Sequence, residues 1–199
     1  YGAVHFWGIK GHIGPPDALM EAGGLYFPVS PDSFFQINRH LNDALVELVT
    51  TRPQRTRRHL LDCYSGVGFF TLALARLVEG AVGIETSVAA HKDALAAARL
   101  NKISNVRFRR AKVESEVFRQ NDIDLVVADP PRTGLTKEAL RGIIRLRPKE
   151  IVLVYCEPPS FARDAARLID AGYILREVDL VDLFPGTYHI ETIGHFTRS

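Results

Sequence analysis

Cysteine is scarce in this chain, whose 199 residues include only Cys63 and Cys156. Two cysteines cannot build the disulfide framework of a small secreted domain, and their spacing is not that of a metal site. Long apolar runs are also missing. No stretch approaches the ~18 residues of a membrane-spanning helix, and no signal-peptide pattern is present. We therefore expect a reduced, cytoplasmic protein with no bound metal and no membrane anchor.

An excess of one charge is lacking as well, because 25 Lys and Arg stand against 23 Asp and Glu, a formal charge of +2. This balance neither requires nor excludes a nucleic-acid partner. The arginines are nevertheless clustered, at residues 52–58 and 107–110. Such clusters suit phosphate contacts, although a charged run is often only a solvated face.

Methionine is also rare: the chain opens on Tyr1 and its single methionine is Met20. We read it as the later part of a longer protein. Residues 1–33 are rich in Gly, Pro and aromatics, with strand-like pieces at 4–9 and 25–29, and we interpret them as a β-rich remnant of a preceding domain. Residues 34–199 then form the main domain. Its first helix is expected to run from Phe34 to Pro53, on the helical spacing of Phe35, Leu41, Leu45, Leu48 and Val49.

Strand and helix patterns alternate regularly through the rest of the chain. Expected strands cover residues 59–64, 81–84, 106–109, 124–128 and 151–155, and expected helices cover 67–78, 88–100, 113–118, 137–146 and 160–171. This alternation predicts a parallel sheet with helices on both faces. Two final strand patterns, 174–180 and 189–196, have no helix between them and predict an antiparallel hairpin. The expected fold is α/β: a doubly wound, mostly parallel, Rossmann-like sheet of seven strands.

A glycine turn, Tyr64-Ser65-Gly66-Val67-Gly68, follows the first expected strand. Gly66 and Gly68 would let the backbone approach a ligand closely. The next strand ends at Glu85, whose carboxylate can accept both hydroxyl groups of a ribose. This pair fits either NAD or S-adenosylmethionine, although Thr71 stands where a dinucleotide fingerprint has its third glycine.

The turn Asp129-Pro130-Pro131-Arg132 follows the fourth expected strand. The two prolines hold the carboxylate rigidly, at the edge of the sheet where ligands bind in open α/β folds. An acidic residue with prolines at this place is common in methyltransferases and unusual in dinucleotide dehydrogenases. The turn therefore favours S-adenosylmethionine as the cofactor.

Cys156 and Glu191 are candidates for chemistry at the same edge. Cys156 ends the fifth expected strand, where the N-terminus of the following helix would lower the pKa of its thiol. Glu191 lies in a strand pattern, where an acid is unusual unless it has a function or is exposed to solvent. Cys63 lies within a strand and is interpreted as a small buried hydrophobe.

Together these segments resemble the RNA (uracil-5-)-methyltransferase family, whose members make 5-methyluridine in tRNA or ribosomal RNA. The resemblance rests on Ser30–Asn38 with its Phe34-Phe35-Gln36, Asp62–Phe70, Asp129–Arg132, Cys156 and His189-Ile190-Glu191. It implies a nucleophile at Cys156, a general base at Glu191, and cofactor contacts from Gln36, Tyr64, Glu85 and Asp129, the last also close to the target base. It also implies S-adenosyl-L-methionine as cofactor and an rRNA or tRNA partner, and we expect a monomer.

The chain departs from the family pattern at three places. Ser65 stands where the family usually has cysteine, Phe69 stands where it often has asparagine, and Glu157 follows the nucleophile, where it would tend to raise the thiol pKa. Two alternatives stay open: a methyltransferase acting on C5 of cytosine, and a non-catalytic RNA-binding paralogue.

Overall fold

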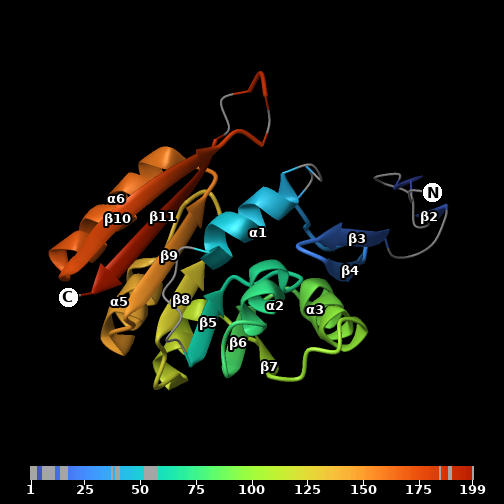
Figure 1. The fold of residues 1–199 in the computed structure, drawn as a ribbon, viewed down its shortest axis with the longest axis horizontal. Helices are drawn as coiled ribbons and strands as arrows, with labels where there is room; N and C mark the ends of the chain where they lie inside the picture. The colour runs from blue at the N-terminus through green and yellow to red at the C-terminus, as the bar shows by residue number, and fades with distance from the viewer. Residues whose placement is uncertain are drawn as a thin grey trace.

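The computed structural model describes residues 4–5, 12–13, 18–36, 38, 41–51, 58–183, 185–187 and 190–198. A seven-stranded sheet forms its centre, with helices on both faces (Figure 1). The strands are β5 (His59–Cys63), β6 (Gly80–Glu85), β7 (Val106–Arg110), β8 (Leu125–Ala128), β9 (Glu150–Tyr155), β10 (Tyr173–Val181) and β11 (Glu191–Arg198). Their order across the sheet is β10-β11-β9-β8-β5-β6-β7. The five strands β5 to β9 are parallel, and β11 is antiparallel to both of its neighbours, which confirms the predicted fold class and hairpin.

The helices divide between the two faces because consecutive residues of each buried strand point to opposite sides. Leu60 and Val127 pack with one apolar cluster, and Leu61 and Val126 pack with the other. The first cluster contains α1 (Asn42–Thr51), α2 (Phe69–Ala75) and α3 (Val88–Leu100), and the second contains α4 (Val113–Glu116), α5 (Lys137–Leu146) and α6 (Pro158–Asp170). A 3₁₀ turn, Val117–Arg119, extends α4. The chain thereby buries both faces, as a parallel sheet requires.

Two short hairpins precede the sheet. β1 (Val4–His5) pairs with β2 (His12–Ile13), and β3 (Ala18–Ala22) pairs with β4 (Leu25–Val29). Residues 6–9 of the first strand-like piece lie outside the described residues. Strands β2 and β3 were not predicted. The β3–β4 hairpin packs on α3, where Asn101 Oδ1 accepts from the Tyr26 amide at 2.9 Å and its Nδ2 donates to the Tyr26 carbonyl at 2.6 Å. The division at residue 33 remains a prediction.

The helix expected from Phe34 begins only at Asn42, so the prediction was wrong over its first turns. Phe35 does not lie on a helix. It packs from an irregular segment against Phe27 and Phe69, with ring centroids 5.5 and 5.4 Å away. Phe35 and Leu41 are therefore spaced as on a helix, although each packs in its own place and they do not share one helix. The helix ends at Thr51, and most of the 52–58 arginine cluster lies outside the described residues.

Candidate active site

A cavity of about 930 Å³ opens at the carboxyl ends of the parallel strands. The predicted residues that line it are Gln36, Tyr64, Gly66, Glu85, Asp129, Cys156 and Glu191. Gly68 is the exception. It stands at the start of α2 with φ 86°, and a Cβ there would lie 2.9 Å from the Phe108 ring, so Gly68 allows the helix to pack against β7.

Strand alternation brings the reactive side chains to one side of the sheet. Asp129, Cys156 and Glu191 each stand two residues from a strand residue that packs with the α1–α3 cluster, namely Val127, Val154 and Ile193. The last paired residues of β9 and β11 are Tyr155 and Thr192, so Cys156 and Glu191 come one step further along the same ladder. Neighbours across an antiparallel pair are about 5 Å apart at Cα. The predicted nucleophile and base are therefore neighbours.

Burial dominates the electrostatics of this group. It raises the pKa of Glu191 from 4.5 to about 7. It also raises the pKa of Asp129 well above its usual value, and the charges of Glu191 and Asp62 raise it further. Two carboxylates competing for ionisation in one cavity suit proton transfer near neutral pH.

The pKa of the Cys156 thiol is raised, first by burial and then by Glu191 and Asp129, while Arg132 opposes the shift. This result corrects the predicted lowering by the N-terminus of α6. The groups that raise the thiol pKa also differ from the one expected, which was Glu157; this residue stands at the N-cap of α6. The thiol is therefore mainly protonated at neutral pH, and the carboxylates around it are the groups that can accept its proton.

Asp62 is a buried acid that the sequence reasoning passed over. Its Oδ2 accepts from Thr71 Oγ1 at 2.5 Å, while its Oδ1 is buried without a hydrogen-bond partner. Burial raises the pKa of Asp62 to about 7, although the hydrogen bond from Thr71 lowers it. Strand alternation could have indicated this position, because Asp62 lies two residues from Leu60 along β5 and so faces the same side as Asp129.

The glycine turn and Glu85 form the other end of the cavity. Tyr64 and Gly66 have φ of 65° and 52°, left-handed values that are unusual for tyrosine and typical of residues held at a ligand site. A Cβ at Gly66 would meet no atom within 4 Å, so the backbone there borders open space. Glu85 Oε2 accepts from the Gly66 amide at 2.9 Å, and Oε1 accepts from the amides of Thr86 and Ser87 at 2.7 Å. These bonds fix the carboxylate at the cavity wall.

Further residues on the wall were not predicted as site residues. Phe34 is 67% exposed and Arg132 is also exposed, whereas Ser65 has a buried hydroxyl without a hydrogen-bond partner. The other additional wall residues are Asp32, Phe35, Val67, Phe69, Phe70, Thr86, Ser87, Ala90, Pro130 and Pro131. Phe69, a departure from the family pattern, packs against Phe27, Phe35 and Phe70, so its ring serves the core as well as the cavity.

Cys63 lies away from this chemistry. It is 0% exposed and belongs to the apolar cluster on the opposite face of the sheet, which confirms its interpretation as a buried hydrophobe. Burial is the main cause that raises its thiol pKa. In the described residues, Cys156 is therefore the cysteine that a ligand in the cavity can reach.

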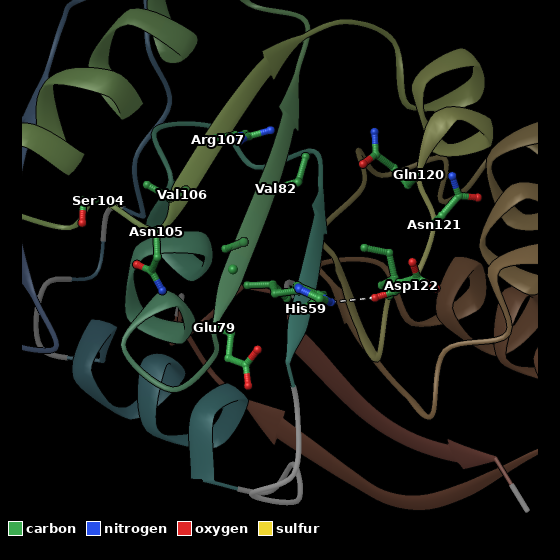
Figure 2. A pocket seen from close by; sticks show the side chains of 14 residues that line it. His59, Glu79, Val82, Ser104, Asn105, Val106, Arg107, Gln120, Asn121 and Asp122 are labelled. Carbon is green, nitrogen blue, oxygen red and sulfur yellow. Dashed lines mark hydrogen bonds between the residues drawn. The ribbon is translucent and has the colours of Figure 1, made fainter.

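A second hollow, of about 450 Å³, lies at the amino ends of β5 and β6 (Figure 2). Polar side chains of His59, Glu79 and Asn105 surround it, and His59 Nδ1 lies 3.0 Å from the Asp122 carbonyl oxygen. Its wall contains no residue predicted for the site. Ligands of open α/β sheets bind at the carboxyl ends, so the larger cavity is the candidate site.

No group of three or more His, Cys, Asp or Glu side chains that could hold a metal ion occurs among the described residues. In the same part of the chain, no helix has the length and apolar character needed to cross a membrane. His189, the first residue of the predicted His-x-Glu motif, lies outside the described residues, and β11 begins at Glu191.

Solved structures support the methyltransferase fold. The Pyrococcus abyssi tRNA (uracil-54, C5)-methyltransferase in complex with S-adenosyl-L-homocysteine has a TM-score of 0.83 and 28% identity, over 94% of this chain and 46% of that one. M. jannaschii TYW2 in complex with AdoMet has a TM-score of 0.63 and 18% identity, over 92% of this chain and 87% of that one, a likeness of fold alone.

Curated relatives agree with this likeness. An uncharacterised RNA methyltransferase of Caldanaerobacter subterraneus subsp. tengcongensis is 38% identical, over 87% of this chain and 40% of the relative. One from Aquifex aeolicus is 37% identical, over 92% of this chain and 43% of the relative. The chain thus spans about two-fifths of the length of these relatives. Because the model of the tRNA (uracil-5-)-methyltransferase family matches residues 21–198, and because the motifs noted in the sequence carry the same likeness, the chain belongs to that family.

Proposed function

We propose that this chain is the catalytic domain of an S-adenosyl-L-methionine-dependent enzyme that methylates C5 of a uridine in rRNA or tRNA. The observation that carries the proposal is the position of Cys156 and Glu191, one step beyond the last pair of the β9–β11 ladder. Both side chains line the cavity that also contains Glu85 and the Tyr64–Gly66 turn. A thiol, a carboxylate and a nucleoside-binding end in one cavity fit methyl transfer to a base.

The residues present fit the cofactor. Glu85, held by three backbone amides, can accept hydrogen bonds from the hydroxyl groups of a ribose. The open space beside Gly66 leaves room for the part of the cofactor next to the ribose. A cavity of about 930 Å³ is large enough for the cofactor and a flipped base together. When bound, S-adenosyl-L-methionine supplies an electrophilic methyl group. Gln36, Tyr64 and Asp129 would contact it, and Asp129 would also be close to the target base.

Cys156 would act as the nucleophile. Carbon 5 of uracil is too weak a nucleophile by itself, but addition of the Cys156 thiolate to carbon 6 moves an electron pair into the ring and gives an enolate with nucleophilic carbon 5. The thiol must first lose its proton. Burial, Glu191 and Asp129 raise its pKa, and Asp129 is the carboxylate that can take this proton while Glu191 stays ionised for the later step.

Glu191 would complete the reaction. After methylation, carbon 5 carries both the methyl group and its original proton. Glu191 takes that proton, the electron pair restores the C5–C6 double bond, and the bond between Cys156 Sγ and carbon 6 breaks. A carboxylate with a pKa of about 7 is well matched to this step near neutral pH.

Incubation with tRNA and rRNA lacking the modification, followed by nucleoside analysis, tests the proposal. The wild type is expected to form 5-methyluridine, Cys156→Ala to form none while still binding the cofactor, and Glu191→Gln to stall with RNA attached to protein on a denaturing gel. Formation of 5-methylcytidine instead would overturn the assignment of uridine as the substrate. Absence of cofactor binding in calorimetry would overturn the assignment of the chain as an enzyme. Normal turnover by Cys156→Ala would remove the proposed nucleophile.

The basic residues of β7 support an RNA partner. Arg107, Arg109 and Arg110 are exposed on the edge strand of the sheet. Exposed arginines can bind backbone phosphates without reading the sequence. Charge reversal at Arg107 and Arg109 is expected to weaken RNA binding and to reduce its salt dependence, while cofactor binding stays unchanged.

A further inference from the structure

Asp164, near the middle of α6, carries a fully buried carboxylate that does not line the active-site cavity. Its Oδ2 accepts from the Leu135 amide at 2.9 Å and from Tyr155 Oη at 3.0 Å. Arg163 and Arg167 bind the same carboxylate, at 2.8 and 3.1 Å. A buried carboxylate is costly unless it is fully bonded, so this arrangement specifies one geometry of the groups around it.

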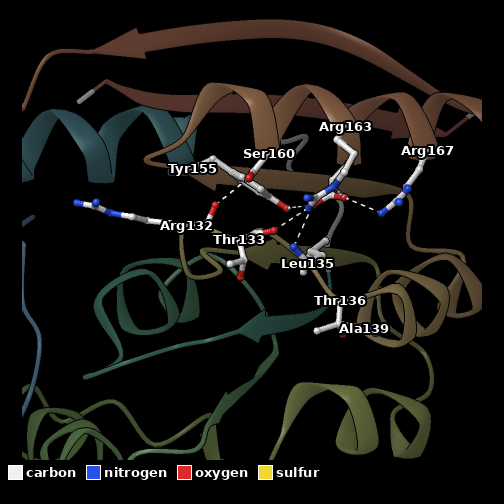
Figure 3. Close-up of polar contacts among 10 residues, drawn as sticks. Arg132, Thr133, Leu135, Thr136, Ala139, Tyr155, Ser160, Arg163 and Arg167 are labelled. Carbon is white, nitrogen blue, oxygen red and sulfur yellow. Dashed lines mark hydrogen bonds and ion pairs between the residues drawn. The ribbon is translucent and has the colours of Figure 1, made fainter. Parts of the chain in front are cut away.

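The partners of Asp164 belong to two segments of the proposed site. Leu135 lies three residues after the Asp129–Arg132 turn, on the same segment between β8 and α5, and Tyr155 immediately precedes Cys156. One carboxylate oxygen thus joins the segment that carries Asp129 to the strand end that carries the thiol. Figure 3 shows Leu135 and Tyr155 converging from these two segments on the inner side of α6.

Two more hydrogen bonds from α6 hold the same turn. Ser160 Oγ donates to the Arg132 carbonyl at 2.8 Å, and Arg163 Nη2 donates to the Thr133 carbonyl at 2.8 Å (Figure 3). The first turns of α6 therefore bind backbone groups of three residues in this segment: Arg132, Thr133 and Leu135.

Gly134 shows how closely the turn approaches this carboxylate. Its φ is 77°, and a Cβ added there would lie 2.4 Å from Arg163 Nη2 and 2.6 Å from Asp164 Oδ2. The backbone at Gly134 thus packs directly on the Arg163–Asp164 pair.

We infer that Asp164 is a positioning residue, which fixes the Asp129–Leu135 segment relative to the Cys156 strand end. The inference rests on the proposed function. Covalent catalysis requires the reacting atoms about 3–3.5 Å apart, and a misplacement of about 1 Å can cost about 100-fold in rate. A carboxylate that holds both segments by direct hydrogen bonds supplies that constraint from outside the cavity.

Asp164→Asn tests this role, with Asp124→Asn as the matched control. Asp124 also ties strands together through a carboxylate, accepting from the Arg58 and His59 amides at 3.0 and 3.3 Å and pairing with Lys149 at 2.8 Å, but it precedes β8 at the opposite edge of the sheet. Asp164→Asn is expected to lower the single-turnover rate of methyl transfer about 10- to 100-fold with the cofactor Kd within about twofold of wild type. Asp124→Asn is expected to keep the wild-type rate. Equal rates in the two variants would overturn the inference.

Milder variants keep the test decisive if Asp164→Asn does not fold. Tyr155→Phe and Ser160→Ala each remove one hydrogen bond of the network and retain most of the packing. Each is expected to lower the single-turnover rate about 3- to 10-fold, in line with the loss of one hydrogen bond. Wild-type rates in both variants would overturn the inference.

Alkylation of the thiol separates this inference from the proposed function. Cys63 is 0% exposed, so iodoacetamide reports on Cys156, and mass analysis of the peptide confirms the position. Burial is the first cause of the raised pKa of this thiol, so a loosened turn should admit water and accelerate alkylation, by about threefold or more, in Asp164→Asn but not in Asp124→Asn. If the wild type methylates no RNA, the proposed function fails while this comparison still decides the role of Asp164. Equal alkylation rates would then refute the role.

Discussion

Replacement of Glu191 by glutamine is expected to change how the stability of this protein depends on pH. Burial raises the pKa of Glu191 from 4.5 to about 7. Between these two pH values the folded state retains a proton that the unfolded chain has released. The stability contributed by this group is therefore lost as the pH rises from about 4.5 to about 7.

The structure gives the size of the effect. The two pKa values are about 2.5 pH units apart, and at ~1.36 kcal/mol for each unit the ionised Glu191 costs the folded wild type about 3 kcal/mol at pH 8. Glutamine carries no charge at any pH and avoids this cost. Asp62, whose pKa burial also raises to about 7, is present in both proteins, so its contribution largely cancels in the difference.

Urea unfolding at pH 5 and pH 8 measures the effect. The free energy of unfolding of Glu191→Gln should exceed that of the wild type by about 2–3 kcal/mol at pH 8 and by less than about 1 kcal/mol at pH 5. The control is Glu79→Gln, because the Glu79 side chain is 62% exposed and pairs with Arg58 on the surface. Parallel pH curves for wild type and Glu191→Gln would refute the assignment of a raised pKa to Glu191.

Three further variants test other parts of the structure. Gly134→Ala should lower the free energy of unfolding by about 2–3 kcal/mol, because its methyl group would lie 2.6 Å from Oδ2 of the buried Asp164, whereas Gly24→Ala, also at positive φ but with no atom within 4 Å, should lose about 1 kcal/mol. Phe69→Ala should cost about 3–4 kcal/mol in urea unfolding, since it empties the centre of a cluster of phenylalanine rings 4.8–6.0 Å apart. Glu85→Gln should raise the cofactor Kd by about tenfold or more in calorimetry, and an unchanged Kd would remove Glu85 from the cofactor site.

Elements with one dominant physical cause were predictable from the sequence. The run at 125–128 is apolar because both of its faces are buried, and it forms β8. Helix α3 covers the predicted residues 88–100, since Ser87 caps it by accepting from the Ala90 amide at 3.3 Å. The prediction of a helix before Asn42 was wrong because Phe35 fits the helical period while it packs from a segment that is not helical.

Within the site, the arrangement could be predicted and its energetics could not. Cys156, Asp129 and Glu191 share one cavity because strands of a parallel sheet end at a common edge and alternate residues share a face. The raised thiol pKa depends on burial and on two neighbouring carboxylates, which no local pattern reveals. Asp164 was missed for the same reason, because its partners Leu135 and Tyr155 come from separate segments.

The insertion of β11 between β9 and β10 has a consequence for the newly made protein. Every other strand of the sheet leaves the ribosome before β11, so a nascent chain can form the end of the cavity at Glu85 and Gly66 while β9 still presents an unpaired edge next to Cys156. Only when β11 enters that gap does the carboxylate of Glu191 arrive beside the sulfur. Competence for the proposed chemistry is thereby delayed until the sheet is complete, and an incompletely translated chain holds a thiol without its partner.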